Sequence, residues 1–302
     1  IIFLCLAALG LAGTRQSLAM QTSPSRTLDT LVIEAAKNGD EKNVERLLSG
    51  GAAPDAVEAV TLRTALHYSV QRGQPGMVRL LLGWRANPNV KDGAGMTPLM
   101  TGAIGTGQFR DDIVRLLVGA KADLDARTPY GDTAIRLAAD KGFTGTVLLL
   151  IDAGAKSDTQ SALNQALLKA AERGNLADVN LLIKRGANAN VQPTAYNAAG
   201  AVVFKSDTPL ISASANGHES VVRALLDAKA NANLPGTGGK TPLIVAVTRG
   251  VQLTKLLLDR GADPNLADNF GKTPLMHVMT GSGSASSNER RELILSLKQA
   301  GA

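Results

Sequence analysis

Two tripeptides are the clearest candidates for chemistry, because glycine followed by lysine and threonine occurs in loops that hold nucleotide phosphates. They are Gly239-Lys240-Thr241 and Gly271-Lys272-Thr273. A phosphate-binding loop of this kind also needs a glycine five residues before the second glycine. Leu234 and Leu266 occupy those positions. Proline follows each threonine, and a Thr-Pro pair is typical of the start of a helix. The sequence therefore argues against nucleotide binding at both tripeptides.

Other catalytic and metal-binding patterns are missing from the sequence. The chain has three histidines, His67, His218 and His277, and one cysteine, Cys5. It shows no Ser-His-Asp arrangement, no His-Glu-x-x-His motif and no ligand spacing that suits zinc. The 26 Asp and Glu residues are scattered along the chain. We therefore expect a protein that is not an enzyme and that needs no metal and no cofactor.

The composition is that of a folded protein with a helical core. The chain has 302 residues, of which 44% are hydrophobic, but only five Phe, three Tyr and one Trp. A core of Leu, Val, Ile and Ala suits closely stacked helices better than a β-sandwich, whose strands favour aromatic and β-branched residues. The formal net charge of +6 is mild for this length, so we expect no nucleic-acid partner.

The first nineteen residues differ from the rest of the chain. Thirteen apolar residues open it, and Ser17 and Ala19 then stand at the −3 and −1 positions of a signal-peptidase site. This apolar run is shorter than the roughly 18 residues that span a membrane. We interpret residues 1–19 as a signal peptide whose start is truncated, since no initiator Met is present, and residues 20–27 as a linker. The alternatives are an uncleaved membrane anchor and an unrelated apolar end.

A repeat of about 33 residues fills the remainder of the chain. Each unit ends in Gly, Arg or Lys followed by alanine. These alanines are Ala52, Ala86, Ala122, Ala155, Ala187, Ala230, Ala262 and Ala302. Most units begin with threonine, at Thr64, Thr97, Thr133, Thr208, Thr241 and Thr273, whereas Gln165 begins one of them. Internal repeats at this period indicate a stack of small structural units.

Each unit predicts two helices. Threonine caps the first helix, which ends at a glycine about nine residues later that supplies a left-handed stop, as at Gly142. The second helix carries apolar residues at i, i+3 and i+4, as in Val222, Leu225 and Leu226. Neither helix buries its apolar face alone, so we expect the units to stack into a solenoid with one continuous core.

These residues resemble the ankyrin repeat. Thr64-Ala65-Leu66-His67 matches the start of that repeat, and Gly186-Ala187-Asn188-Ala189-Asn190 matches its end. The resemblance covers residues 28–302 in about eight repeats. It implies an all-α solenoid of helix-turn-helix units joined by short β-hairpin-like loops. It also implies that His67 and His218 hydrogen-bond to backbone groups near the loops.

Two features depart from the family pattern. Arg85, Lys121 and Lys229 stand where glycine would accept left-handed backbone, at a cost of about 1 kcal/mol each. The unit at Gln165 lacks Thr-Pro-Leu, and we expect a joint there that bends the stack without splitting it.

The resemblance also implies where a partner binds, since partners of this family usually bind the concave side, through loop tips and first helices. Carried over by position, the candidates at loop tips are Tyr130, Lys240, Phe270 and Lys272, and those on first helices are Tyr68, Arg72, Lys141, Arg173 and Arg249. The last four recur at one place in the unit and would form a basic row that suits an acidic partner. The alternative is that they are solvated helix ends, where cations are favourable.

The connection between Asn190 and Thr208 is about ten residues longer than the family spacing. It contains Tyr196, Phe204 and Lys205, with an apolar run that would be unfavourable if it were exposed. One interpretation is a protruding hairpin that contacts a partner. The other is a longer loop that folds back on the groove of its neighbour.

We therefore expect a bacterial-type, monomeric protein-binding module that is periplasmic or secreted. Its single cysteine and its lack of Asn-x-Ser/Thr sites favour a bacterial envelope over a eukaryotic secretory route. It would contact a membrane only through the N-terminal segment, if that segment is uncleaved. The alternatives are an accessory or protective subunit of a periplasmic enzyme system and a secreted effector that acts on host proteins.

Overall fold

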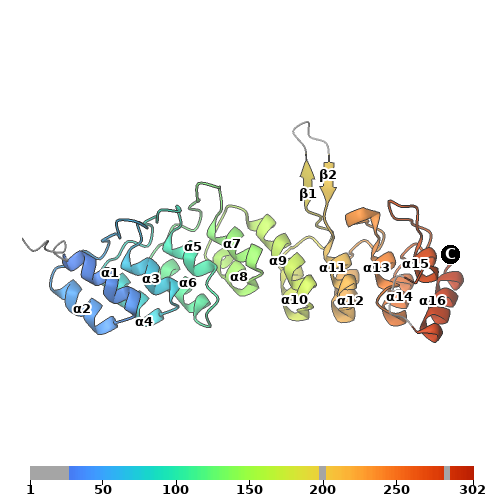
Figure 1. Cartoon of the computed structure of the whole chain (residues 1–302), viewed down its shortest axis with the longest axis horizontal. Helices are drawn as coiled ribbons and strands as arrows, with labels where there is room; N and C mark the ends of the chain where they lie inside the picture. The colour runs from blue at the N-terminus through green and yellow to red at the C-terminus, as the bar shows by residue number, and fades with distance from the viewer. Residues whose placement is uncertain (1–26, 197–201, 282–285) are drawn as a thin grey trace, which may run out of the picture.

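Sixteen α-helices, arranged in two parallel rows, account for most of the described residues (Figure 1). The structure is a computed structural model that describes residues 27–196, 202–281 and 286–302, with only the backbone of the two strands between 194 and 205. The proposed signal peptide, and the linker up to residue 26, lie outside this range. No helix in the described part of the chain is long and apolar enough to cross a membrane.

The two rows correspond to the two helices predicted for each unit. The first row contains α1 (Leu28–Asn38), α3 (Ala65–Gln71), α5 (Pro98–Ala103), α7 (Ala134–Lys141), α9 (Thr159–Arg173), α11 (Pro209–Ala215), α13 (Pro242–Ala246) and α15 (Pro274–Met279). The second row contains α2 (Glu41–Ser49), α4 (Pro75–Gly83), α6 (Arg110–Gly119), α8 (Thr144–Asp152), α10 (Leu176–Lys184), α12 (Glu219–Asp227), α14 (Val251–Asp259) and α16 (Ser287–Gln299). Loops that join one pair to the next lie along one edge of the stack (Figure 1).

The threonines cap the first helices as the sequence predicts. In α11, for example, the Thr208 hydroxyl accepts a hydrogen bond from the Ile211 amide at 3.2 Å. Thr27, at the end of the proposed linker, caps α1 by accepting from the Thr30 amide at 3.2 Å. Proline follows the cap in α5, α11, α13 and α15. Each cap satisfies one of the backbone amides that a helix leaves unpaired at its start.

The alanine that ends each unit closes the second helix. Its amide donates to the carbonyl of the leucine five residues earlier, as from Ala86 to Leu81 and from Ala230 to Leu225, at 3.0 and 2.9 Å. Both leucines are fully buried, and the alanines are buried with them. The buried Leu, Val, Ile and Ala residues of all repeats form one continuous core. The helix end and the core are therefore built by the same residues.

Asn and Asp side chains join the loop of each repeat to the loop of the next. The Asn89 side-chain oxygen accepts from the Asp123 amide at 2.7 Å, and that of Asn190 accepts from the Asn231 amide at 2.6 Å. Asn233 accepts from the Asp263 amide at 2.7 Å and donates to the Gly261 carbonyl at 3.1 Å. We call this series the amide ladder; its acceptors are Asp29, Asp55, Asn89, Asp125, Asn164, Asn190 and Asn233. The ladder sets the spacing of neighbouring loops.

Three basic residues occupy left-handed backbone, as the sequence predicts. Arg85, Lys121 and Lys229 have φ values of 63°, 63° and 65°, whereas glycine holds this place in other repeats. A side chain in this conformation places Cβ too close to the carbonyl oxygen. These three loops therefore store strain.

The unit at Gln165 differs from its neighbours because its first helix is longer. α9 begins at Thr159, so helix replaces the hairpin that precedes the first helix elsewhere. Asn164, on α9, then supplies the ladder oxygen and accepts from the Asn188 amide at 2.8 Å. α9 contacts both α7 and α11, so the stack continues through this unit.

The long connection after α10 forms an antiparallel hairpin of two strands, β1 (Thr194–Tyr196) and β2 (Val202–Lys205). The hairpin stands away from the helices (Figure 1), and its contact with a partner stays a prediction. Its base is attached to the next repeat, because the Gln192 side-chain amide donates to the carbonyls of Ser206 and Pro235 at 3.0 and 2.6 Å.

Replacing Asn233 with alanine should lower the free energy of unfolding by about 2 kcal/mol, because two hydrogen bonds of the ladder are lost. Circular dichroism during urea unfolding measures this. Asn180→Ala is the matched control, since Asn180 is exposed on α10 and alanine favours helix. Equal midpoints for the two variants would contradict a structural role for the ladder.

Replacing Lys229 with glycine should raise the free energy of unfolding by about 1 kcal/mol, because the left-handed strain is removed. Arg115→Gly in the middle of α6 should instead lower it by about 1 kcal/mol. The same unfolding experiment reports both. If the two variants shift the midpoint in the same direction, the strain argument fails.

Candidate groove site

In the C-terminal repeats, the residues that precede three capping threonines line one groove. They are Asp207, Lys240 and Lys272. The floor of the groove includes Ile211 and Ala215 of α11 and Val245 of α13, and Thr248 and Arg249 line it just after α13 ends. We call this site the C-terminal groove.

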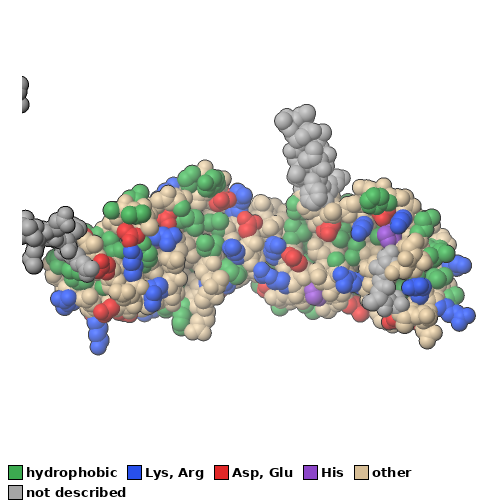
Figure 2. All heavy atoms as spheres, viewed as in Figure 1, with side chains coloured by type: hydrophobic (Ala, Val, Ile, Leu, Met, Phe, Trp, Pro, Cys, Tyr) green, Lys and Arg blue, Asp and Glu red, His purple; other side chains and the backbone are tan. Residues whose placement is uncertain are grey.

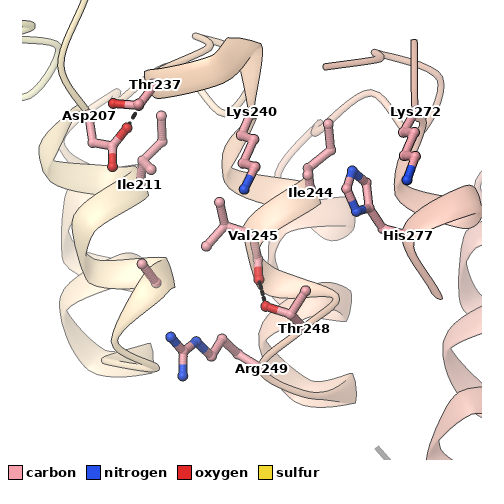
Figure 3. Close-up of a pocket in the computed structure, with 11 residues that line it drawn as sticks. Asp207, Ile211, Thr237, Lys240, Ile244, Val245, Thr248, Arg249, Lys272 and His277 are labelled. Atoms are coloured by element: carbon pink, nitrogen blue, oxygen red, sulfur yellow. Dashed lines mark hydrogen bonds between the residues drawn. The ribbon is translucent and has the colours of Figure 1, made fainter. Parts of the chain in front are cut away.

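The C-terminal groove is an open depression of about 530 Å³, within the size range of binding sites for small ligands. Figure 3 shows Lys240 and Lys272 extending from two hairpins in the same direction, toward the helices. Arg249 lies at the far end of the groove on the α13 side. Lys240, Lys272 and Arg249 are exposed, so their charges are available to a ligand.

Asp268 shapes the hairpin that carries Lys272. Its carboxylate accepts from the amides of Phe270 and Lys272 at 2.9 and 3.0 Å and from His277 Nε2 at 2.9 Å. Burial raises the pKa of Asp268, but the hydrogen bonds from Lys272, His277 and Phe270 outweigh it and hold the pKa below the ordinary value. The hairpin is therefore built around a charged carboxylate. Gly271, at φ 74°, completes the turn.

Neighbouring hairpins hold each other in place. The Asn269 amide donates to the Gly238 carbonyl at 3.0 Å, which joins the hairpin of Lys272 to that of Lys240. Gly238 and Gly239 belong to a short 3-10 turn, η1 (Thr237–Gly239), and the Thr237 amide donates to Asp207 at 2.8 Å. Both lysines thus project from hairpins with a defined separation.

The charges of the C-terminal groove are unbalanced, whereas the charged residues that precede two earlier capping threonines are paired. Arg63 pairs with Asp92 at 3.0 Å, and Asp132 pairs with Arg136 at 2.9 Å. Within the described residues, Lys240, Lys272 and Arg249 form no ion pair, and Asp207 is the one carboxylate that lines the groove. Figure 2 shows Lys and Arg side chains beside a histidine over the C-terminal repeats.

The proposed basic row along the first helices is not a continuous free surface. Arg173 donates to the carbonyls of Lys141 and Gly142 at 2.7 and 2.9 Å, so its guanidinium closes the end of α7. Asn216 stands at the equivalent place in the next repeat, between Arg173 and Arg249. Arg72, Lys141 and Arg249 are exposed but lie in separate repeats. Of the four cations in that hypothesis, the structure brings only Arg249 together with the two lysines.

Tyr68 lies inside an N-terminal cluster of charged groups. Its hydroxyl and that of Thr61 donate to the carboxylate of Glu58, and the Lys37 ammonium also donates to it. The Lys37 nitrogen lies 4.8 Å from the centre of the Tyr68 ring. The hydrogen bond from Lys37, followed by those from Thr61 and Tyr68, lowers the pKa of Glu58 from 4.5 to about 2. These contacts give Tyr68 a structural role.

The aromatic residues at two hairpin tips are exposed. Tyr130 is 88% exposed and Phe270 is 81% exposed. They occupy equivalent places in their hairpins, but only Phe270 belongs to a hairpin that borders the C-terminal groove. Tyr196, Phe204 and Lys205 lie on β1 and β2, where the structure describes only the backbone.

The three histidines have structural partners. His67 Nε2 lies 3.1 Å from the Met96 carbonyl and His218 Nε2 lies 3.0 Å from the Glu172 carbonyl, so each joins two repeats through a backbone group, as the resemblance implies. Because a carboxylate only accepts, His277 donates from Nε2 to Asp268. No group of three or more His, Cys, Asp or Glu in the described residues could hold a metal ion.

The sequence places His277 on the groove side of its first helix, as the structure confirms, but Asp207 and Ile211 were not predicted as parts of this site. A positional signal existed, since Asp207 precedes Thr208 just as Lys240 precedes Thr241. The long insertion before Thr208 concealed this equivalence.

Comparison with known proteins gives consistent results. A family model described as ankyrin repeats (three copies) matches residues 31–128, 102–193, 167–268 and 210–289. The mouse B-cell lymphoma 3 protein homolog is 30% identical over 240 residues, covering 78% of this chain and 51% of that protein. The human B-cell lymphoma 3 protein is 30% identical over 244 residues, with the same shares. The chain thus spans about half the length of these curated relatives.

A solved structure shows the same fold. The human ASB11 ankyrin repeat domain matches this structure with a TM-score of 0.59 and 21% sequence identity, covering 77% of this chain and 98% of that one. The solenoid predicted from the sequence is confirmed.

Replacing Glu58 with glutamine should lower the free energy of unfolding at pH 7 by about 2 kcal/mol. The neutral amide loses the charged contact with Lys37 that lowers the pKa of Glu58. A carboxylate with a lowered pKa stabilises the fold above its ordinary pKa of 4.5, and that contribution disappears as the pH falls toward 2. Wild type and variant should therefore converge in acid. Urea unfolding from pH 7 to pH 2.5 measures this, with Glu45→Gln on the exposed side of α2 as the control. A gap that stays constant down to pH 2.5 would contradict the assignment.

Proposed function

The chain belongs to the ankyrin repeat family, and on that premise we propose that it is a non-enzymatic scaffold that binds a partner protein at the C-terminal groove. The observation that carries this proposal is the set of three unpaired cations, Lys240, Arg249 and Lys272, around one open groove. Exposed charge that has no partner within the fold is available for a partner outside it. Phe270, on the bordering hairpin, adds exposed apolar area.

The residues around the C-terminal groove also support a partner protein as its ligand. Interfaces combine aromatic anchors with charged rims, and the energy concentrates in a few residues. Phe270 and the lysines of the two hairpins supply these elements together. Tyr130 is equally exposed, but its hairpin carries Asp132, which is already paired with Arg136.

We further propose that the protein is exported to the periplasm or out of the cell. The apolar opening run, with Ser17 and Ala19 at the cleavage positions, supports this. The relatives named above are proteins of mouse and human, so the bacterial-type assignment depends on these sequence features alone.

Capture from an extract of the producing organism tests the binding proposal. The immobilised chain is crosslinked to bound proteins, and these are identified by mass spectrometry for wild type and for Lys240→Glu/Lys272→Glu. We expect at least one protein that the wild type enriches and that the variant loses by about tenfold or more, because reversed charge repels an acidic partner.

The control for this capture is Lys184→Glu/Lys298→Glu, which makes the same change in net charge on α10 and α16. This control should retain the partner. If the groove variant and the control give the same proteins, the groove is not the binding surface.

N-terminal sequencing of the protein recovered from the periplasm of a secreting bacterial host tests export. The mature chain should begin at Met20, because signal peptidase cuts after small residues. Ala19→Arg should accumulate uncut. Recovery of wild-type protein with its first nineteen residues intact would refute cleavage.

A further inference from the structure

We propose that the C-terminal groove takes an extended, acidic segment of the partner protein, with carboxylates beside Lys240 and Lys272 and an apolar side chain on the floor formed by Ile211, Ala215 and Val245. This inference rests on the proposed function and names the chemistry of the partner. The charge, the lining and the surroundings of the groove each support an extended, acidic ligand.

Charge comes first. Lys240 and Lys272 project from adjoining hairpins that the bond from Asn269 to Gly238 joins, and Figure 3 shows both side chains directed the same way. The Asp207 carboxylate already accepts the Thr237 amide at 2.8 Å. A segment with carboxylates at alternate positions would neutralise the two ammonium groups, and Arg249 would hold a third negative charge.

The lining of the groove suits an extended chain. Ile211, Ala215 and Val245 give the floor an apolar part, and Lys240 and Lys272 project above it. An extended segment sends alternate side chains to opposite sides, so acidic and apolar residues in alternation would match both surfaces.

The adjacent strand also favours an extended ligand. β2 ends at Lys205, one residue away from Ser206 and two from Asp207 at the groove wall. The described sheet has only two strands, so its outer edges are open to a further strand. A chain that leaves the groove toward β2 would meet backbone groups able to pair with it.

The surroundings argue against nucleic acid as the ligand. A nucleic acid needs many cations along a continuous path. On the second row of helices, Arg185 pairs with Asp152, Arg223 with Glu219 and Arg260 with Asp227, at 2.8, 3.0 and 2.7 Å. These pairs interrupt a continuous path of free cations on that face, which suits a short acidic segment better than a nucleic acid.

Fluorescence anisotropy with a short labelled peptide in which Glu and Leu alternate tests the inference on the full chain. The peptide should bind, and its affinity should fall about tenfold or more in Lys240→Glu/Lys272→Glu and at high salt. Lys184→Glu/Lys298→Glu, with the same net charge, should bind as the wild type does. Circular dichroism melting of both variants establishes that they are folded.

Two further peptides separate charge from shape. A peptide with Lys in place of Glu should not bind, and one with Ser in place of Leu should bind more weakly, because it loses the apolar contact. Equal affinity for the Ser and Leu peptides, or equal loss in both double variants, would overturn the proposed mode. An absence of Glu–Leu binding would also overturn it. If the groove variant still loses a partner in the capture experiment, the scaffold function stands without this ligand chemistry.

Discussion

The structure depends on one recurring hydrogen bond, in which an Asn or Asp side-chain oxygen accepts the backbone amide of a loop further along the stack. Loops between helices carry backbone amides that have no partner within the helices. The ladder from Asp29 to Asn233 satisfies them and places each hairpin at a defined distance from its neighbour. The core fixes how the helices stack, whereas the ladder fixes where the hairpin side chains point. The position of the C-terminal groove follows from both, since its walls are hairpins and its floor is helices.

The same repeat produces different surfaces along the chain because the charged positions are partnered differently. In the N-terminal repeats, the position before the capping threonine holds Arg63, which is paired with Asp92, and Glu58 is surrounded by Lys37 and Tyr68. These charges stabilise the stack itself. In the C-terminal repeats, Lys240 and Lys272 have no such partners among the described residues. The difference in available charge is what points to a binding surface.

Much of this fold was predictable from the sequence, because its rules are local. The caps at Thr208 and its equivalents and the left-handed Arg85 each depend on a few neighbouring residues. The role of Arg173 was not predictable, because its carbonyl partners belong to a different repeat. Nor was the early start of α9 at Thr159, where a helix replaces a hairpin and Asn164 takes over the ladder bond. The groove combines residues from three repeats, and only three-dimensional packing identifies which charges remain unpaired.

Site-specific photocrosslinking tests directly whether a partner protein contacts the C-terminal groove. A photoreactive amino acid would replace Thr237, an exposed groove residue whose backbone amide keeps its bond to Asp207. A second variant of the chain would carry the photoreactive amino acid in place of Lys184, on α10 in the second row of helices. We expect a crosslinked adduct with the partner from position 237 and none from position 184. An adduct from position 184 alone, or equal adducts from both positions, would contradict the groove as the contact surface.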